Sequence, residues 1–281
     1  MPTYDQLRVQ AEAGGLVFFG DPLTRTRVDA EVTYSVQETP AATVTVFNPP
    51  DGFAASVRRG SLVRVSAGWN GALGVIFAGT PVPDGVEVDA DNRDVQVKIK
   101  IRPGNDAWRK AVSVVRRGQA SYRDTVAGIV ADMGLTLGEL DLSLAPTYLP
   151  RGFAWEGPGW RALRTLAASA SCEIAFDGTT VNFVRTAQGL SSNLESVPKF
   201  TQSSTGGNII GSPKYTDKGL AFEVIFDPRV SLGRRIALEF YDKFNGRQVR
   251  GVYVPTAVQH NFSSHGTART TRVTARFAGG L

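Results

Sequence analysis

The chain has 281 residues with one Cys, two Met and two His, and its 31 Lys and Arg exceed its 26 Asp and Glu to give a formal net charge of +5. A single Cys excludes an intramolecular disulfide framework and a structural zinc site built on several cysteines, and two His argue against His-rich metal sites and His-based triads. Hydrophobic residues make up 42% and charged residues 20% of the chain, so we expect a globular protein rather than a disordered one. At roughly 100–200 residues per domain, the length predicts two domains or a few smaller ones.

The sequence contains no evident targeting or membrane signal. Its first residues, Met1 to Gln6, lack the basic region and apolar run of a signal peptide. No stretch approaches the roughly 18 apolar residues of a membrane helix. We therefore expect a protein that is made in the cytoplasm and has no membrane span.

The first hundred residues follow the pattern of successive strands. Between Val28 and Val36, Val and Ala alternate with polar residues such as Asp29 and Glu31, which is the period of two of a half-buried strand. The spacing of such segments is typical of antiparallel barrels and sandwiches, and we expect a small β-barrel. The expected strands are 16–19, 28–36, 42–47, 61–67, 74–79 and 95–101.

Helical signals follow in the middle of the chain. Ser121 and Asp124 fit a capping box, apolar residues then recur at helical spacing up to Met133, and Gly134 is a plausible C-cap. A second helix is expected over 159–170. Two alternating segments, 172–176 and 180–184, are separated by Asp177-Gly178 and predict a β-hairpin.

The last third returns to strands after a linker or long loop over 191–208, which is rich in Ser, Thr, Gly and Asn. It also echoes the first third, because the segments 43–49 and 222–228 both end in Phe-Asn/Asp-Pro and are followed by a Gly turn and another strand. This repetition indicates a duplicated barrel. The expected strands are 220–226, 235–241, 250–254, 257–262 and 270–277.

These segments together predict a mainly β protein with an α+β middle, in which two similar antiparallel β-barrels of the tube type bracket small α+β subdomains. We expect a first barrel over 1–104, a helix-containing α+β subdomain over 105–150, a helix-plus-hairpin subdomain over 151–200 and a second barrel over 201–281.

Residues that could support catalysis or metal binding are few. His260 and His265 are five residues apart in a strand and a loop, which is not the spacing of a helical metal site. Cys172 is expected to be a buried structural thiol, because a nucleophilic Cys needs a nearby base. The acidic segment that contains Asp84, Asp89, Asp91 and Asp94 departs from the calcium-loop pattern, and we expect a solvated loop there.

Other candidate sites are equally weak. Asp141 and Glu156 could serve as the acid pair of a hydrolase only if they converged in one cleft. Trp155 and Trp160 could form a carbohydrate platform, but packing of a turn is the simpler interpretation. The loop 205–208 precedes a strand and lacks the helix N-terminus that would hold a phosphate. We therefore predict no catalytic, cofactor-binding or metal-binding residues and no cofactor.

The basic residues are mostly Arg and are spread along the chain, with pairs at 116–117, 234–235 and 58–59. A nucleic-acid-binding protein usually concentrates such charge on one face. We expect solvated strand ends and partners in ion pairs, although DNA contact remains open if an oligomer lines a channel with these groups.

Three stretches, taken in order along the chain, resemble the baseplate hub proteins of tailed bacteriophages, a family related to the hub part of type VI secretion spikes. The first resembles that family's signature of a strand, Gly-x-x-Val-x-Val-x-Ala-Gly-Tyr and Ile-Phe-x-Gly, with Trp69 where an aromatic residue is usual. The stretches are residues 44–49, 57–69 and 75–79, then 159–167 and 176–183, then 211–213, 218–220, 226–228 and 232–233.

The resemblance implies a structural, non-enzymatic protein of the virion tail baseplate, assembled in the host cytoplasm. A homotrimer with two barrels per chain would give a pseudo-sixfold ring that joins the hexameric tail tube to the trimeric spike or central fibre. Other baseplate proteins and the tape measure protein are further expected partners. DNA would only pass through the channel, so we expect Arg residues at protein contacts and a channel wall that is not strongly basic.

Two alternatives remain open at this point. A cell-wall hydrolase component of the tail would need its acid pair in one cleft. A carbohydrate-binding β-sandwich module would need exposed coplanar aromatic rings at a loop end and would be a monomer.

Overall fold

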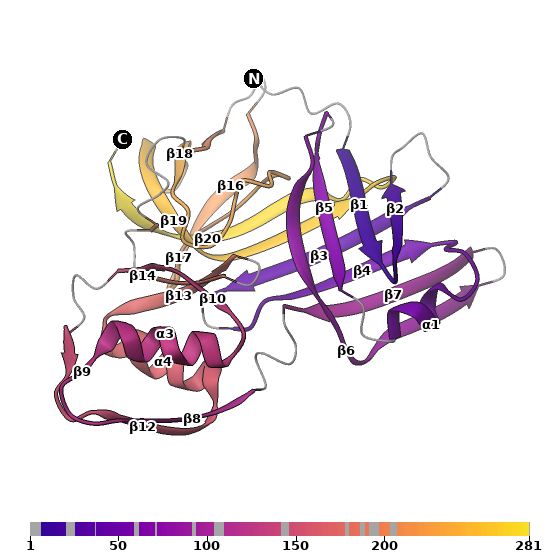
Figure 1. The fold of residues 1–281 in the computed structure, drawn as a ribbon. Coiled ribbons are helices and arrows are strands. Elements are labelled where there is room, and N and C mark those ends of the chain that lie inside the picture. Colours follow the sequence, from indigo (N-terminus) through magenta and orange to yellow (C-terminus); the bar gives the residue numbers. More distant parts are fainter. Residues whose placement is uncertain are drawn as a thin grey trace.

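A computed structural model describes residues 7–20, 26–36, 38–58, 62–70, 72–91, 94–103, 110–141, 146–177, 180–185, 189–190, 197–202 and 207–280. One large sheet of 13 strands runs through the molecule, and the first and last thirds of the chain both contribute to it (Figure 1). The middle third forms a separate layer of helices and small sheets beside it.

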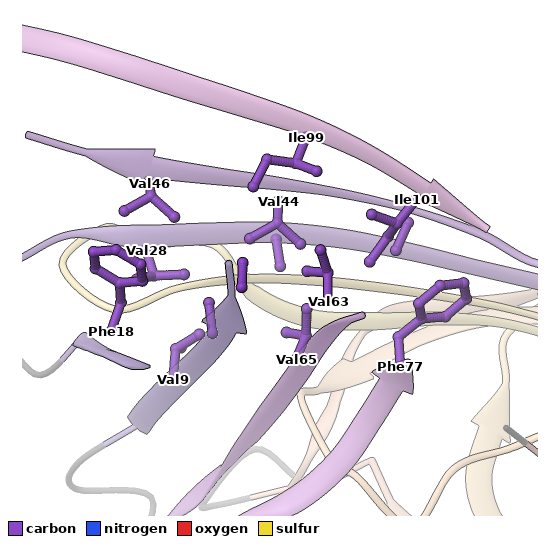
Figure 2. Packing of buried hydrophobic residues seen from close by; sticks show 14 of the residues in the cluster. Val9, Phe18, Val28, Val44, Val46, Val63, Val65, Phe77, Ile99 and Ile101 are labelled. Carbon is purple, nitrogen blue, oxygen red and sulfur yellow. The ribbon is translucent and has the colours of Figure 1, made fainter. Parts of the chain in front are cut away.

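The first half of the large sheet follows the order β3-β4-β7-β6-β5-β1-β2. Its strands wrap around a core of Val, Ile and Phe side chains (Figure 2), because each strand presents every second residue to the same side. The elements are β1 (Leu7–Ala13), β2 (Leu16–Gly20), β3 (Val28–Ser35), β4 (Ala41–Phe47), α1 (Phe53–Arg58), β5 (Val63–Trp69), β6 (Gly74–Asp91) and β7 (Asp94–Arg102).

The second half follows the order β16-β17-β20-β19, and β19 also pairs with β18, which pairs with β15. A second core cluster lies among these strands. The elements are β15 (Lys199–Thr201), β16 (Ile209–Thr216), β17 (Gly219–Ile225), β18 (Ile236–Asp242), β19 (Arg247–Ser263) and β20 (Arg269–Gly279).

The two halves repeat the same arrangement. The path β3-β4-β7-β6-β5 of the first half has its counterpart in the path β16-β17-β20-β19-β18 of the second. The long strands β6 and β19 each pair with one neighbour along their first part and with another along their second part. This repeated strand order agrees with the predicted pair of similar antiparallel units.

Residue-level pairing fixes how the halves correspond. Ile99 lies between Val44 and Val86 in the first half, and Val273 lies between Phe222 and Val258 in the second. All six side chains are buried, so residues that face the core in one half correspond to residues that face the core in the other.

The two segments that end in Phe-Asn/Asp-Pro lie on corresponding strands, β4 and β17. Aligning them by sequence, however, differs by one residue from aligning them by strand pairing. Phe47 is half-buried, with the Arg27 guanidinium 4.4 Å from its ring centroid, whereas Phe226 is fully buried. A shift of one residue moves a side chain to the other face of a strand. The structural counterpart of Val46 is therefore Val224, because Val46 pairs with Val97 as Val224 pairs with Thr271.

The middle third packs two helices between a three-stranded sheet and a two-stranded ribbon (Figure 1). One core cluster contains residues from both predicted middle subdomains, and the boundary at residue 150 stays a prediction. The elements are β8 (Ala111–Arg116), β9 (Ala120–Ser121), α3 (Tyr122–Asp132), β10 (Thr136–Leu140), β11 (Tyr148–Leu149), β12 (Phe153–Pro158), α4 (Gly159–Ser169), β13 (Cys172–Asp177) and β14 (Thr180–Arg185).

Both predicted helices form, as α3 and α4, and α3 begins and ends where its predicted caps lie. The Ser121 side chain accepts a hydrogen bond from the Asp124 backbone N–H (3.2 Å), which satisfies one of the free donors of the first turn of α3. Gly134 follows the helix with φ +77°, a conformation that favours glycine. Of the helices in the described parts of the chain, none is long and apolar enough to cross a membrane.

Three sequence predictions need correction. The acidic segment is not a solvated loop: Asp84, Asp89 and Asp91 belong to the second part of β6, and Asp94 begins β7, with which that part pairs. The strands expected at 250–254 and 257–262 form one strand, β19, with a register shift between Pro255 and Ala257 that accommodates the missing N–H of Pro255. The expected linker over 191–208 contains β15, while 191–196 and 203–206 lie outside the described residues.

Candidate assembly surface

The large sheet has a buried face and a polar face, and both continue across the two halves. Along β3, Val28 and Val32 are buried whereas Asp29, Glu31 and Thr33 lie on the opposite side. The neighbouring strands alternate in the same way. The polar face includes Glu87, Asp89, Lys98, Lys100, Thr43, Thr45, Gln259, Asn261, Thr270, Arg272 and Glu223.

Charges on this polar face compensate one another. Lys100 Nζ lies 2.6 Å from Glu87 Oε1, and Arg272 Nε lies 3.4 Å from Glu223 Oε1. The hydrogen bond and the positive charge of Lys100 lower the pKa of the Glu87 carboxyl. Among the described residues of this face, acidic and basic side chains are interspersed and form no continuous basic stripe.

The two halves of the large sheet join where β3 pairs with β19 in antiparallel fashion. Val32 lies opposite His260, and Glu31 lies opposite Asn261. The ladder ends in a hydrogen bond from Val36 N to Thr256 O (3.1 Å) at one end and from Ser264 N to Val28 O (3.0 Å) at the other. Main-chain hydrogen bonds therefore hold the two halves together along the whole of β3.

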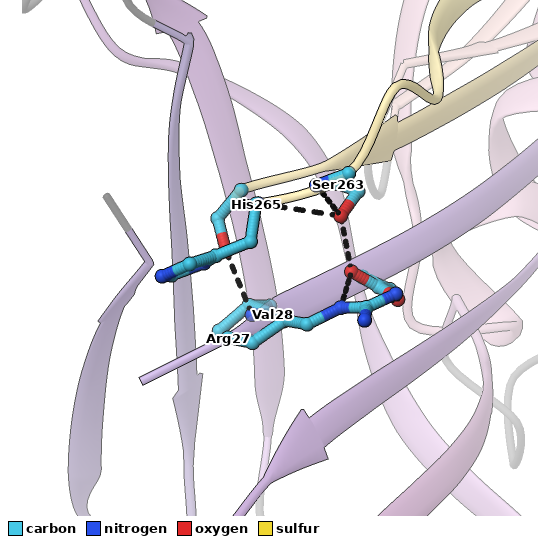
Figure 3. Close-up of polar contacts among 7 residues, drawn as sticks. Arg27, Val28, Ser263 and His265 are labelled. Carbon is cyan, nitrogen blue, oxygen red and sulfur yellow. Dashed lines mark hydrogen bonds and ion pairs between the residues drawn. The ribbon is translucent and has the colours of Figure 1, made fainter. Parts of the chain in front are cut away.

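Side chains reinforce one end of this joint (Figure 3). Ser263 Oγ donates a hydrogen bond to Asp29 Oδ1 (2.5 Å), and the same carboxylate accepts hydrogen bonds from Nε and Nη2 of Arg27. Ser264 Oγ accepts a hydrogen bond from the Val28 backbone N–H (3.0 Å). His265 contributes here as well, since its Nδ1 lies 2.8 Å from Ser264 Oγ.

The core side of the joint contains His260. Its Nδ1 is 2.9 Å from Thr271 Oγ1 and its Nε2 is 3.1 Å from Val230 O, and its ring meets the Phe226 ring edge-on with 5.5 Å between centroids. Complete burial lowers the pKa of this imidazole to about 4. His260 is therefore a neutral, hydrogen-bonded core residue.

The Cys172 thiol is not poised for nucleophilic attack. Burial raises its pKa to about 11, and Sγ donates a hydrogen bond to Asp141 O (3.3 Å). At neutral pH the group is therefore a thiol rather than a thiolate, in agreement with a buried structural role.

The proposed hydrolase pair does not converge. Asp141 follows β10 and lies 3.4 Å from Arg185 of β14, whereas Glu156 is on the β12–β8 ribbon. Helices α3 and α4 lie between these two sheets (Figure 1). One cleft cannot hold both carboxylates in this arrangement.

The two tryptophans pack rather than form a flat platform. Trp155 stacks beside Phe153 with 6.5 Å between ring centroids, and Trp160 contacts Phe176 at 5.3 Å with a 55° tilt. Both are partly buried against the core of the middle third. Their arrangement matches the local packing that the sequence predicts.

The remaining candidate sites are dispersed. Among the described residues, no group of three or more His, Cys, Asp or Glu side chains could hold a metal ion. Arg116 and Arg117 are exposed at the end of β8, Arg234 and Arg235 are half-buried before β18, and Arg58 donates a hydrogen bond to Val86 O (3.0 Å). Arg59 and residues 205–206 of the candidate loop 205–208 lie outside the described part of the chain.

Sequence reasoning missed several residues that tie the halves together. Trp69 Nε1 at the end of β5 donates a hydrogen bond to Phe226 O (2.7 Å), so this aromatic side chain links the first half to the second. Phe226 and Phe262 come from the second half but belong to the core cluster of the first. No periodicity within one strand could reveal such contacts.

No family model and no curated protein matches the sequence. Solved structures do match over nearly the whole chain. The tail protein from Neisseria meningitidis MC58 has a TM-score of 0.68 at 10% identity over 96% of both chains. The 43 kDa tail protein of prophage MuSo2 from Shewanella oneidensis has a TM-score of 0.62 at 10% identity over 96% of this chain and 98% of that one.

A component of the Escherichia coli type VI secretion system also shares the fold, with a TM-score of 0.54 at 11% identity over 91% of this chain and 74% of that one. These identities establish the fold. The chain thus has the mainly β fold of phage tail proteins, and the resemblance indicated by the sequence motifs is confirmed at that level.

Proposed function

We propose that the chain is a structural baseplate hub protein of a phage tail and not an enzyme. Three copies would form a pseudo-sixfold ring that joins the hexameric tail tube to the trimeric spike or central fibre. The observation that carries this proposal is the repeated strand order of the two halves, because three chains with two similar units each present six similar units around a ring.

The polar face supports a role as the wall of the channel in such a ring. It extends over both halves, and Glu87, Glu223 and Glu31 balance neighbouring basic or amide groups. A wall with compensated charge would let DNA pass without retaining it, since DNA affinity depends on contacts from unpaired Lys and Arg. Other baseplate proteins and the tape measure protein are the further partners in this proposal, and the virion tail baseplate is its location.

Electron microscopy of the purified full-length chain at high concentration tests the proposal. We expect ring-shaped particles whose averaged end-on views contain six similar lobes around a central channel. Averages that contain single, separate chains only, or a stack of two chains without a channel, would contradict a hub.

A further inference from the structure

Helix α4 and the neighbouring strand β12 form an open groove on the middle third of the chain. The groove has a volume of about 520 Å³, and it is lined by Trp155 of β12 and by Arg161, Arg164, Thr165 and Ala168 of α4. In Figure 1 the β12–β8 ribbon lies on the side of the helices that faces away from the large sheet. The groove is therefore separate from the β3–β19 joint and from the polar face described above.

The two arginines of the groove have no acidic partner among the described residues. Both Arg161 and Arg164 are exposed, whereas Arg185, Arg250 and Arg272 each form an ion pair with Asp or Glu. Side chains three positions apart are neighbours on a helix surface, so the two positive charges repel each other. Arg161 is also in the first turn of α4, where a positive charge interacts unfavourably with the helix dipole. Within the described part of the chain nothing offsets these costs, and an anion from outside would.

The indole of Trp155 adds a second unmet requirement. Its Nε1 is buried and has no hydrogen-bond partner among the described residues. Nearly all buried polar groups in proteins are hydrogen-bonded, so a buried donor without an acceptor is unfavourable. The ring is held in place because it stacks beside Phe153 and packs against the core of the middle third. The side chains that line the groove thus include two guanidinium groups and an indole, which donate hydrogen bonds and accept none.

The spacing of the arginines suits a carboxylate. Side chains three positions apart on a helix have Cβ atoms about 5–6 Å apart, so the guanidinium groups of Arg161 and Arg164 can reach the same carboxylate. Hydrogen bonds between guanidinium and carboxylate groups are charge-assisted and often bidentate. The Trp155 ring and Ala168 make another part of the lining apolar. The groove therefore matches an acidic side chain that has an apolar neighbour.

A segment of a protein fits this lining better than a free anion or a nucleic acid. A free phosphate or carboxylate would leave the apolar part of the groove uncovered. A nucleic acid is usually bound by basic residues that form a stripe or face, whereas the groove has two arginines and the exposed Glu156 follows Trp155 along β12. An acidic segment with apolar residues uses both parts of the lining.

We propose that this groove between α4 and β12 binds an acidic segment of a partner protein. A carboxylate of the segment lies between Arg161 and Arg164, and the apolar side chain beside it covers the ring of Trp155. An oxygen of the segment near this ring would also supply the acceptor that Nε1 lacks. The proposal goes beyond the hub function and does not depend on it, because the groove lies within one chain.

A short capped peptide in which Glu and Leu alternate is the probe. Its binding to the full chain is measured by fluorescence anisotropy, and the indole N–H signals are followed by NMR in protein that carries ¹⁵N-labelled Trp. The chain has four Trp, and the signal that Trp155→Phe removes belongs to Trp155. We expect saturable binding that weakens as the salt concentration rises and that shifts this indole signal.

Substitution of the arginines locates the site. Arg161→Gln and Arg164→Gln should each raise the dissociation constant of the peptide by about tenfold, because each removes charge-assisted hydrogen bonds. Neither should lower the urea midpoint of unfolding, because each also removes a repulsion between like charges. The matched control is Arg247→Gln on β19, since Arg247 is likewise exposed and without an ion pair among the described residues. It should leave the dissociation constant unchanged.

Binding of the Glu-Leu peptide that requires both arginines and shifts the Trp155 signal supports the proposal. The proposal is overturned if the peptide does not bind at millimolar concentration, if the same peptide with Gln in place of Glu binds equally well, or if Arg247→Gln weakens binding as much as Arg161→Gln. Equal affinity for a single-stranded DNA of the same net charge would also overturn it, because the groove would then bind anions without selecting a protein segment. The hub function fails on a different result, a single-chain molar mass at every concentration.

Discussion

Gln259 of β19 donates a hydrogen bond from Nε2 to Glu31 Oε1 of β3 across 2.6 Å, although the two residues are 228 positions apart in the chain. This contact lies on the polar face of the joint, directly above the buried pair of Val32 and His260 on the opposite face. Both faces of the sheet thus hold the first and last thirds of the chain together. We therefore expect the two halves to unfold as one unit.

Phe226 tests this coupling because it belongs to the second half and is fully buried in the core of the first. Phe226→Ala should lower the free energy of unfolding by about 3–5 kcal/mol, since it removes a buried ring and leaves a cavity. Urea denaturation measures the change. The control is Phe244→Ala, because Phe244 is 95% exposed and its loss should cost no more than about 0.5 kcal/mol. Equal effects of the two substitutions would contradict the packing described here.

The burial of neutral His260 predicts that the free energy of unfolding falls in acid. Its pKa is about 4 in the fold and near 6.5 in the unfolded chain, so between these values the unfolded state binds more protons. The stabilising contribution is fully present above pH 6.5 and is lost as the pH falls towards 4, by about 3 kcal/mol in total.

Urea titrations between pH 4 and 7 measure this dependence. His260→Gln should flatten it over that range, whereas Phe244→Ala should leave it intact, because Phe244 is exposed and carries no titratable group. A stability that does not change with pH in the unsubstituted protein would contradict a neutral, buried His260.

The Cys172 thiol should resist modification in the folded protein. With a pKa of about 11 it is almost wholly protonated at pH 7, and its burial blocks access. Absorbance after addition of a disulfide reagent should therefore rise slowly in native buffer and quickly in denaturant. Stoichiometric reaction within seconds in native buffer would show that the thiol is reactive and exposed.

The charge balance of the polar face predicts weak binding to DNA. At about 0.1 M salt, where exposed charges beyond about 10 Å are screened, the assembled protein should not retain duplex DNA. Glu31→Lys combined with Glu87→Lys should produce salt-dependent binding, measured by fluorescence anisotropy. Asp132→Lys at the end of α3 serves as the control, because it adds charge away from this face. Tight binding of DNA by the unsubstituted protein would contradict the proposal that charges on the polar face compensate one another.

Local signals in the sequence predict most of the elements. Alternation located β3, β4 and β7, and the Ser121 cap located α3. The second part of β6 is wrongly predicted as a loop, because Pro81, Pro83 and Asp84 are typical of turns, although the residues from Val86 to Asp89 alternate as in a half-buried strand.

The candidate assembly surface was less predictable than the elements. The repeated segments indicate two similar halves, but the pairing of β3 with β19 follows only from the sheet order. Trp69 stood out as part of a motif, yet its bond to Phe226 spans 157 positions. Contacts between residues so far apart in the chain form only in the folded protein, and they produce no periodic pattern in the sequence of either strand.

The molar mass of the full chain in solution tests the central claim most directly, because that claim is that three two-unit chains close one ring. Sedimentation equilibrium at increasing concentration should converge on three times the 30.1 kDa of a single chain and go no further. A single-chain mass at every concentration, or convergence on two chains, would contradict the ring.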